Sequence, residues 1–200
     1  MLHSRRWFAA VLACCLLAAC AADQNWKTHD IAGLVPDLAF TLNDDQGRQV
    51  GAQDYRGKVT LLFFGYTHCP DVCGTTLAQL AHALRESGGG PDKARVLFVT
   101  VDPARDTTAV MHEYVQAFGP QFTGLRGDKA AIDTLTRRYR VSYKLDKPDA
   151  KGNYEVTHSS AVFVFDRNGH ARLLFTPKDA PDAWGHDLRR LIAASGQDQG

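Results

Sequence analysis

Residues 59–73 read VTLLFFGYTHCPDVC, and this stretch decides the fold. The continuous apolar run 58–65 is typical of a central β-strand that is covered on both faces. A turn that carries Cys69 and Cys73 follows, and residues 70–87 have the periodicity of a helix that a run of glycines ends. A helix N-terminus favours thiolates, because it carries partial positive charge and free N–H groups. The chemistry of this junction is therefore that of two thiolates: redox exchange, or binding of a soft metal.

The rest of the chain predicts the other elements of one α/β domain. The predicted strands besides 58–65 are, in chain order, 38–42, 48–50, 95–101, 122–125, 160–165 and 171–175. The predicted helices besides 70–87 are 107–118, 128–140 and 181–194. The polar segment 141–153 is expected to be irregular. This order of elements is that of a thioredoxin-like fold, a central mixed sheet flanked by helices, which here begins with a β-hairpin.

The first nineteen residues resemble the signal peptide of a bacterial lipoprotein. Arg5 and Arg6 precede an apolar run, 7–19, that is too short to span a bilayer comfortably. The run ends in LAAC at 17–20, which resembles a lipobox, so we expect cleavage before Cys20 and a lipid on Cys20. The alternatives are an ordinary secretory signal or an uncleaved anchor, with Cys20 incidental.

The sequence thus predicts three segments. A signal peptide, 1–19, precedes a lipid-anchored tether, 20–35, and a thioredoxin-like domain, 36–200. Trp26 could instead pack back onto the domain. The domain is expected to face the periplasm and to be held at the membrane by the lipid on Cys20.

The cysteines and charges of the exported part narrow the function. The leader holds Cys14 and Cys15, so the domain keeps one cysteine pair and no disulfide framework, in a compartment where disulfides persist. This favours a redox or copper site over structural zinc. The leader also holds two of the 23 basic residues and none of the 22 acidic ones, which leaves a net charge of −1. That charge argues against binding to nucleic acid.

The spacing of Cys69 and Cys73 leans weakly toward a metal. Residues four apart on a helix have Cβ atoms about 5–6 Å apart, whereas a disulfide needs about 3.5–4.5 Å. Two thiolates on one trigonal metal need sulfurs only about 4 Å apart, with metal–sulfur bonds of about 2.3 Å. A disulfide can still close if Cys69 lies just before the helix.

A soft metal with two thiolates needs a third ligand, and imidazole suits copper. His158 directly precedes a predicted buried strand, at the corner that faces the first helix in a thioredoxin-like fold. A structural role is the alternative for His158. His68 abuts Cys69 and is expected to tune its pKa rather than bind metal. The other histidines of the domain are expected at solvated helix positions or beside a hairpin turn: His82, His112, His186 and His170.

Acidic residues near the cysteines are expected to have local roles. Asp71 is predicted to be a solvated turn acid. The segment 102–106 is expected to cap the helix that begins at 107, and Met111 on that helix is expected in the core.

Three segments, in this order, resemble the signature segments of the Sco/SenC family: GYTHCPDVC at 65–73, VDPARDT at 101–107 and YEVTHS at 154–159. The resemblance runs over residues 36–195. Members of that family are thioredoxin-like copper proteins concerned with assembling cytochrome c oxidase. The resemblance implies that Cys69, Cys73 and His158 bind copper, as Cu(I), Cu(II) or both.

The resemblance also implies a function. The protein would be a metallochaperone that helps to assemble the dinuclear copper centre of cytochrome c oxidase subunit II, with other copper chaperones or thiol–disulfide proteins as further partners. The family is usually attached by a transmembrane helix, so a lipid on Cys20 would be a departure. The alternative is a periplasmic thiol–disulfide oxidoreductase in which Cys69 and Cys73 are the catalytic redox pair. A thiol peroxidase is less well supported, because nothing beside Cys69 matches a peroxidase motif.

Overall fold

The computed structural model describes residues 25–194. The predicted signal peptide, 1–19, and Cys20 lie outside the described residues, so cleavage and lipidation stay predictions. Among residues 25–194, no helix is both long and apolar enough to cross a membrane.

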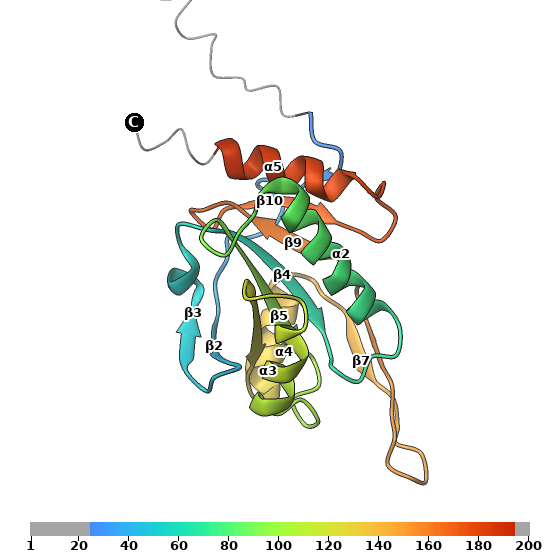
Figure 1. Cartoon of the computed structure of the whole chain (residues 1–200). Helices are drawn as coiled ribbons and strands as arrows, with labels where there is room; N and C mark the ends of the chain where they lie inside the picture. Colours follow the sequence, from blue (N-terminus) through green and yellow to red (C-terminus); the bar gives the residue numbers. More distant parts are fainter. Residues whose placement is uncertain (1–24, 195–200) are drawn as a thin grey trace, which may run out of the picture.

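A mixed β-sheet forms the centre of the described chain (Figure 1). Its strand order is β1-β10-β9-β4-β5-β6-β2-β3. The strands are β1 (His29–Asp30), β2 (Thr41–Asp44), β3 (Gln49–Gly51), β4 (Val59–Gly65), β5 (Ala94–Thr100), β6 (Phe122–Arg126), β9 (Val162–Phe165) and β10 (Ala171–Phe175). β4, β5 and β6 are parallel, and β9 and β2 flank them as antiparallel neighbours. The predicted mixed sheet with an N-terminal hairpin, β2–β3, is confirmed.

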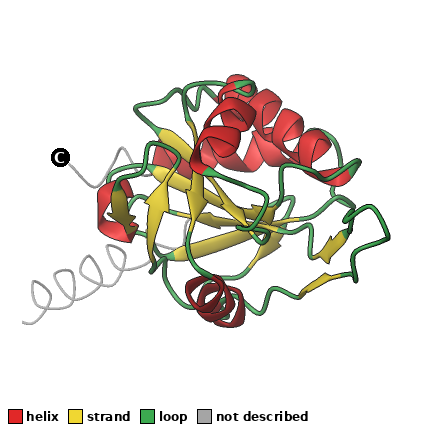
Figure 2. Ribbon diagram, turned by 90° about the horizontal axis from the view of Figure 1, so that it is seen from below, coloured by secondary structure: helices red, strands yellow, loops and turns green. Residues whose placement is uncertain are grey.

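Helices cover both faces of this sheet. They are α2 (Val72–Ser87), α3 (Thr108–Gln116), α4 (Lys129–Arg138) and α5 (Ala183–Ala194), with a short 3-10 helix, η2 (Ala52–Tyr55), after β3. α2 and α5 pack side by side on one face, and α4 lies on the other (Figures 1 and 2). The side chains of β4 alternate between these layers: Phe63 packs on Phe98, and Phe64 packs on Tyr139 at the end of α4. Every residue of β4 is buried, as predicted for a strand covered on both faces.

The segment 141–153 departs from its predicted irregularity. β7 (Tyr143–Leu145) pairs with β8 (Val156–His158) as a separate two-stranded sheet, and the chain between them projects from the body as a hairpin (Figure 1). The strands were missed because each has only three residues, several of them exposed, so no hydrophobic alternation develops.

Residues 25–35, part of the predicted tether, pack against the domain. β1 pairs with β10, Ile31 is buried, and the guanidinium carbon of Arg190 lies 5.3 Å from the centre of the Trp26 ring. The structure thus shows the alternative considered for Trp26. The folded part of the chain reaches back at least to Asn25, where Arg190 donates a hydrogen bond to the carbonyl oxygen.

Asp187 of α5 joins this N-terminal segment to the domain. Its fully buried carboxylate accepts hydrogen bonds from the backbone N–H of Lys27 and from the N–H and hydroxyl of Thr28, at 2.7–3.1 Å. Burial acts to raise the pKa of Asp187, but hydrogen bonds from His186, Lys27 and Thr28 outweigh it, so the pKa lies below its usual value.

We expect Asp187→Asn to lower the free energy of unfolding at pH 7 by about 1–3 kcal/mol. The substitution removes the charged acceptor of the hydrogen bonds that Lys27 and Thr28 donate. A carboxyl with a lowered folded-state pKa stabilises the fold above its unfolded pKa of about 3.9 and loses that effect as pH falls through the folded pKa. The difference between wild type and variant, measured by urea unfolding, should therefore be full at pH 7 and shrink below about pH 4.

Asp146→Asn is the control, because Asp146 is exposed in the β7–β8 hairpin and pairs loosely with Lys144 at 3.8 Å. Its effect should stay within about 0.5 kcal/mol. Equal destabilisation by the two variants would contradict the role assigned to Asp187.

Candidate metal centre

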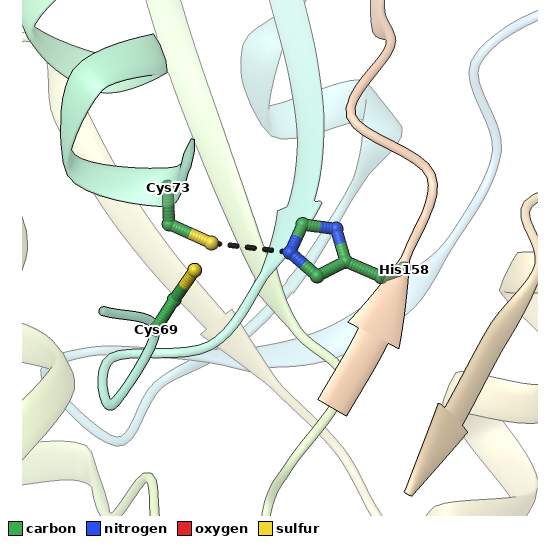
Figure 3. Close-up of side chains that lie close together, drawn as sticks. All are labelled: Cys69, Cys73 and His158. Atoms are coloured by element: carbon green, nitrogen blue, oxygen red, sulfur yellow. Dashed lines mark hydrogen bonds between the residues drawn. The ribbon is translucent and has the colours of Figure 1, made fainter. Parts of the chain in front are cut away.

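Three side chains converge at the C-terminal end of β4 (Figure 3). Cys69 lies in the turn after β4, Cys73 in the first turn of α2, and His158 at the end of β8. Their two sulfurs and one ring nitrogen lie within 4.8 Å of one another, and Sγ of Cys73 is 3.2 Å from Nε2 of His158. Among the described histidines, cysteines and acids, no other group of three or more lies this close together. The structure thus brings together all three residues that the sequence singled out.

Local backbone geometry sets the positions of the two cysteines. The N–H of Cys69 donates to the carbonyl of Tyr66, which closes the turn after β4. α2 then begins at Val72 rather than at Pro70, because Asp71 has φ −134° and ψ −88°, outside the helical region. Cys69 therefore lies just before the helix, which is the arrangement that permits a disulfide as well as a metal.

Gly65, the last residue of β4, makes room for Cys73. A Cβ atom on Gly65 would lie 2.9 Å from Sγ of Cys73 and 2.6 Å from a ring carbon of Phe98. Distances below about 3 Å are clashes between non-bonded carbon and sulfur atoms. Only glycine lets the first turn of α2 approach the end of the strand this closely.

The two thiols differ in environment. Cys69 is partly exposed, and burial acts to raise its pKa, but N–H groups of Asp71 and Cys73 at the start of α2 donate to it and lower the pKa overall. Cys73 is fully buried, and burial raises the pKa of its thiol far above the usual value. The negative charge of Asp106 acts in the same direction on Cys73. In the metal-free protein, Cys69 is the more readily ionised thiol.

His158 presents a lone pair to the sulfurs. Its Nδ1 lies 3.0 Å from the carbonyl oxygen of Ser159, so Nδ1 carries the proton and donates, and Nε2 is left as the free acceptor beside Cys73. Burial lowers the pKa of His158, although the hydrogen bond to Ser159 acts in the opposite direction. A neutral imidazole in this tautomer is the form that binds a metal.

Aromatic packing fixes the orientation of the His158 ring. The ring lies edge-on to Tyr66, with centroids 5.9 Å apart, and packs near Phe63 at 6.1 Å. The hydroxyl oxygen of Tyr66 accepts a hydrogen bond from the N–H of Val156 at 3.4 Å. Tyr66 therefore ties strand β8 to the turn that carries Cys69.

The segment 102–106 does not cap α3, contrary to its prediction. Thr107 caps that helix by accepting from the N–H of Val110. Buried Asp102 pairs with Arg105 and accepts a hydrogen bond from the hydroxyl of Tyr154 at 2.7 Å. Arg105 in turn donates to the carbonyl of Tyr154 and stacks 3.7 Å from the centre of its ring. This network holds the hairpin that leads to His158.

Asp106, also in that segment, is hydrogen-bonded to the turn that carries Cys69. Its fully buried carboxylate accepts hydrogen bonds from the N–H of Thr67 at 3.1 Å, from the Thr67 hydroxyl at 2.6 Å and from the Thr100 hydroxyl at 2.5 Å. Nδ1 of His68 lies 3.6 Å away, on a half-exposed ring outside the cluster of three. Sequence reasoning missed both supporting networks, because helix caps and buried carboxylate clamps use the same residue types. The only available signal was that segments 101–107 and 154–159 both matched a family pattern.

The remaining histidines of the described chain lie outside the centre, and His29 of β1 has its Nε2 3.5 Å from a carboxylate oxygen of Asp179. Each of His112, His170 and His186 contacts a carboxylate, of Asp45, Asp37 and Asp187 respectively, at 2.8–2.9 Å. His82 is exposed on α2. Of the three expected at solvated helix positions, His186 is partly buried, because it packs beside Asp187.

The donor set suits a soft or borderline metal. Two thiolates and one imidazole nitrogen are ligands that Cu(I), Cu(II) and Zn²⁺ accept. With bonds of about 2.0–2.3 Å, three such ligands lie about 4 Å apart around one ion. The three ligand atoms lie within 4.8 Å of one another, so small side-chain rotations would bring them to the distances that one ion requires. The same two sulfurs could instead join as a disulfide.

Comparison with known proteins shows similarity over most of the chain. The mitochondrial SCO2 homologue of Mus musculus is 34% identical over 194 residues, 94% of this chain and 76% of that protein. The chain spans 59% of the bovine and human SCO2 homologues.

Solved structures of Sco proteins are also similar to this chain. Bradyrhizobium japonicum ScoI, solved with copper bound, is 40% identical with a TM-score of 0.69, covering 78% of this chain and 98% of that one. BsSco, described as a member of the Sco family of cytochrome c oxidase assembly proteins, is 17% identical with a TM-score of 0.61, covering 83% and 97%, and shows the fold alone. The family model described as SCO1/SenC matches residues 35–193, and this chain belongs to that family.

Proposed function

We propose that this protein is a copper chaperone that carries copper on Cys69, Cys73 and His158 and delivers it to the dinuclear copper centre of cytochrome c oxidase subunit II. The observation that carries the proposal is the convergence of two sulfurs and one unprotonated imidazole nitrogen within 4.8 Å. Copper is the cargo of this site. Family membership and the copper-bound ScoI relative support copper over zinc.

The three proposed ligands differ in whether they must lose a proton before copper binds. His158 is already neutral, with Nε2 unprotonated and facing Sγ of Cys73, and Cys69 has a lowered pKa. Cys73 must release its proton when copper binds, because burial keeps its thiol protonated in the metal-free protein. Thiolates suit Cu(I), and imidazole also suits Cu(II), so the site can hold either oxidation state.

The partial exposure of Cys69 would allow copper to be transferred from this side of the site. Cys73 is fully buried, whereas Cys69 lies on the turn between exposed His68 and exposed Pro70. A cysteine thiolate of the acceptor would therefore reach copper from the Cys69 side and replace Cys69 first. Cys73 and His158 would hold the ion until the second exchange.

The same geometry favours one alternative, a thiol–disulfide oxidoreductase. A partly exposed thiol with a lowered pKa lies beside a buried one, which is the arrangement of an attacking and a resolving cysteine. Cys69 and Cys73 would form a disulfide as two electrons and two protons pass to a disulfide of subunit II or of another exported protein. This reaction needs no role for His158.

We further propose that a lipid on Cys20 holds the domain at the membrane, facing the periplasm. Asn25, five positions after Cys20, is already bound to α5 through Arg190. A chain extends by at most about 3.5 Å per residue, so the anchor would keep α5 within roughly 20 Å of the lipid.

We expect His158→Ala to weaken Cu(I) binding by at least about 100-fold, because loss of residues that merely orient a ligand already costs 10–100-fold. Titration of the reduced protein with Cu(I) in competition with a chelator measures this affinity. His82→Ala is the matched control, since His82 is an exposed histidine of α2, and it should bind copper like wild type. Unchanged affinity in His158→Ala, with persistent reduction of a subunit II disulfide, would replace the chaperone by the oxidoreductase.

Copper-loaded protein is expected to transfer its copper to the reduced, metal-free copper domain of subunit II, because each bond to Cys69, Cys73 or His158 can be exchanged for one to the acceptor. Separation of the two proteins followed by metal analysis measures the transfer. An acceptor whose cysteines are alkylated is the control and should take none. Equal copper on both acceptors would contradict thiolate exchange.

Cys20→Ala is expected to move the protein from the membrane fraction to the soluble fraction, because it removes the acceptor of the lipid. Fractionation of cells with detection of the protein checks this, together with the mass of the purified N-terminus. A variant that stays in the membrane fraction would show that another anchor is used.

A further inference from the structure

Asp102 and Asp106 are both fully buried near the candidate centre, but only one is neutralised by a cation. Asp102 forms an ion pair with Arg105. The carboxylate of Asp106 is held by an N–H and two hydroxyls, which are dipoles without net charge. Among the described residues, its one basic neighbour within 4 Å of the carboxylate oxygens is the half-exposed ring of His68, at 3.6 Å.

Arg126 donates a hydrogen bond to the backbone of Asp106 and does not pair with its carboxylate. Its Nε donates to the backbone carbonyl of Asp106 at 3.2 Å, and another nitrogen donates to the carbonyl of Pro103. Every hydrogen bond to the carboxylate is donated by a protein N–H or O–H, which suits an ionised group. A buried negative charge is therefore hydrogen-bonded to Thr67, on the turn that carries Cys69.

We propose that Asp106 sets the balance between the two oxidation states of copper at the Cys69–Cys73–His158 centre by disfavouring Cu(I) relative to Cu(II). This rests on the proposed function of that centre. Asp106 is a positioning and electrostatic residue here and does not touch the metal.

The net charge of the site explains why Asp106 would disfavour Cu(I) rather than Cu(II). Two thiolates and a neutral imidazole with Cu(I) carry a net charge of −1, whereas the same ligands with Cu(II) are neutral. The one-electron reduction of Cu(II) to Cu(I) therefore adds a negative charge to a site that already faces Asp106. Repulsion between like charges opposes that step.

Proximity explains why the effect is appreciable. Asp106 binds both the N–H and the hydroxyl of Thr67, two residues before Cys69. Its charge also acts on the Cys73 thiol. At an effective dielectric constant of about 20, two unit charges as far apart as about 12 Å still change an equilibrium constant roughly tenfold.

The test uses Asp106→Asn, which keeps the side-chain shape and removes the charge. We expect the ratio of Cu(I) affinity to Cu(II) affinity to rise about tenfold, which raises the one-electron potential of bound copper by about 59 mV. Chelator competition with each oxidation state gives the two affinities, and a redox titration of the copper-loaded protein gives the potential independently.

Two control variants separate charge from structure. Thr67→Val removes the clamping hydroxyl but leaves the Asp106 charge, so it should change both affinities alike and leave their ratio within about threefold, less than the charge effect. Asp187→Asn removes an equally buried carboxylate that instead binds Lys27 and Thr28, and its ratio should match wild type.

Each outcome decides between the proposals. A ratio in Asp106→Asn equal to that in Asp187→Asn, with copper still bound by wild type through His158, would overturn the role of Asp106 and leave the chaperone standing. The same shift in Thr67→Val as in Asp106→Asn would also overturn it, because position rather than charge would then be responsible. Failure of wild type to bind either ion would overturn the proposed function and this inference together.

Discussion

The end of β4 and the start of α2 are in close contact, and this contact positions both cysteines of the candidate centre. At Gly65, strand and helix approach so closely that a single added carbon would meet the sulfur of Cys73 and the ring of Phe98. This contact seals Cys73 inside the protein and leaves Cys69 on the turn outside. The difference between the two thiols follows from it, because one is desolvated and the other receives N–H groups at the helix N-terminus.

The centre also depends on a second contact, between parts of the chain that are 85 residues apart. Tyr66 on the cysteine turn holds the backbone of β8 and packs against the ring of His158. Asp102 and Arg105 reach the same hairpin through Tyr154. The three ligand atoms are thus placed by rigid elements and their cross-links, so a metal needs little rearrangement to bind.

Burial and charge together suggest how such a site can hold an ion and still release it. Cys73 lies inside, whereas Cys69 and His158 are partly exposed, so an incoming thiolate can reach the ion from the turn that carries Cys69. The carboxylate of Asp106, which no cation among the described residues pairs with directly, raises the free energy of the Cu(I) form of the site, whose net charge is negative. A site meant for delivery gains from both features, because very tight retention would oppose transfer to an acceptor.

The thioredoxin-like fold was predictable from the sequence, since the apolar run of β4, the periodicity of α2 and the closing hairpin each follow from local pattern. It also singled out Cys69, Cys73 and His158, partly because the corner before a buried strand is predictable once the fold is known. It did not determine the β7–β8 hairpin, the packing of residues 25–35 on α5, or the roles of Asp102 and Asp106. These features depend on contacts between segments that lie far apart in the chain. They emerge from the tertiary structure, because hydrogen bonds between distant segments leave no period in the sequence.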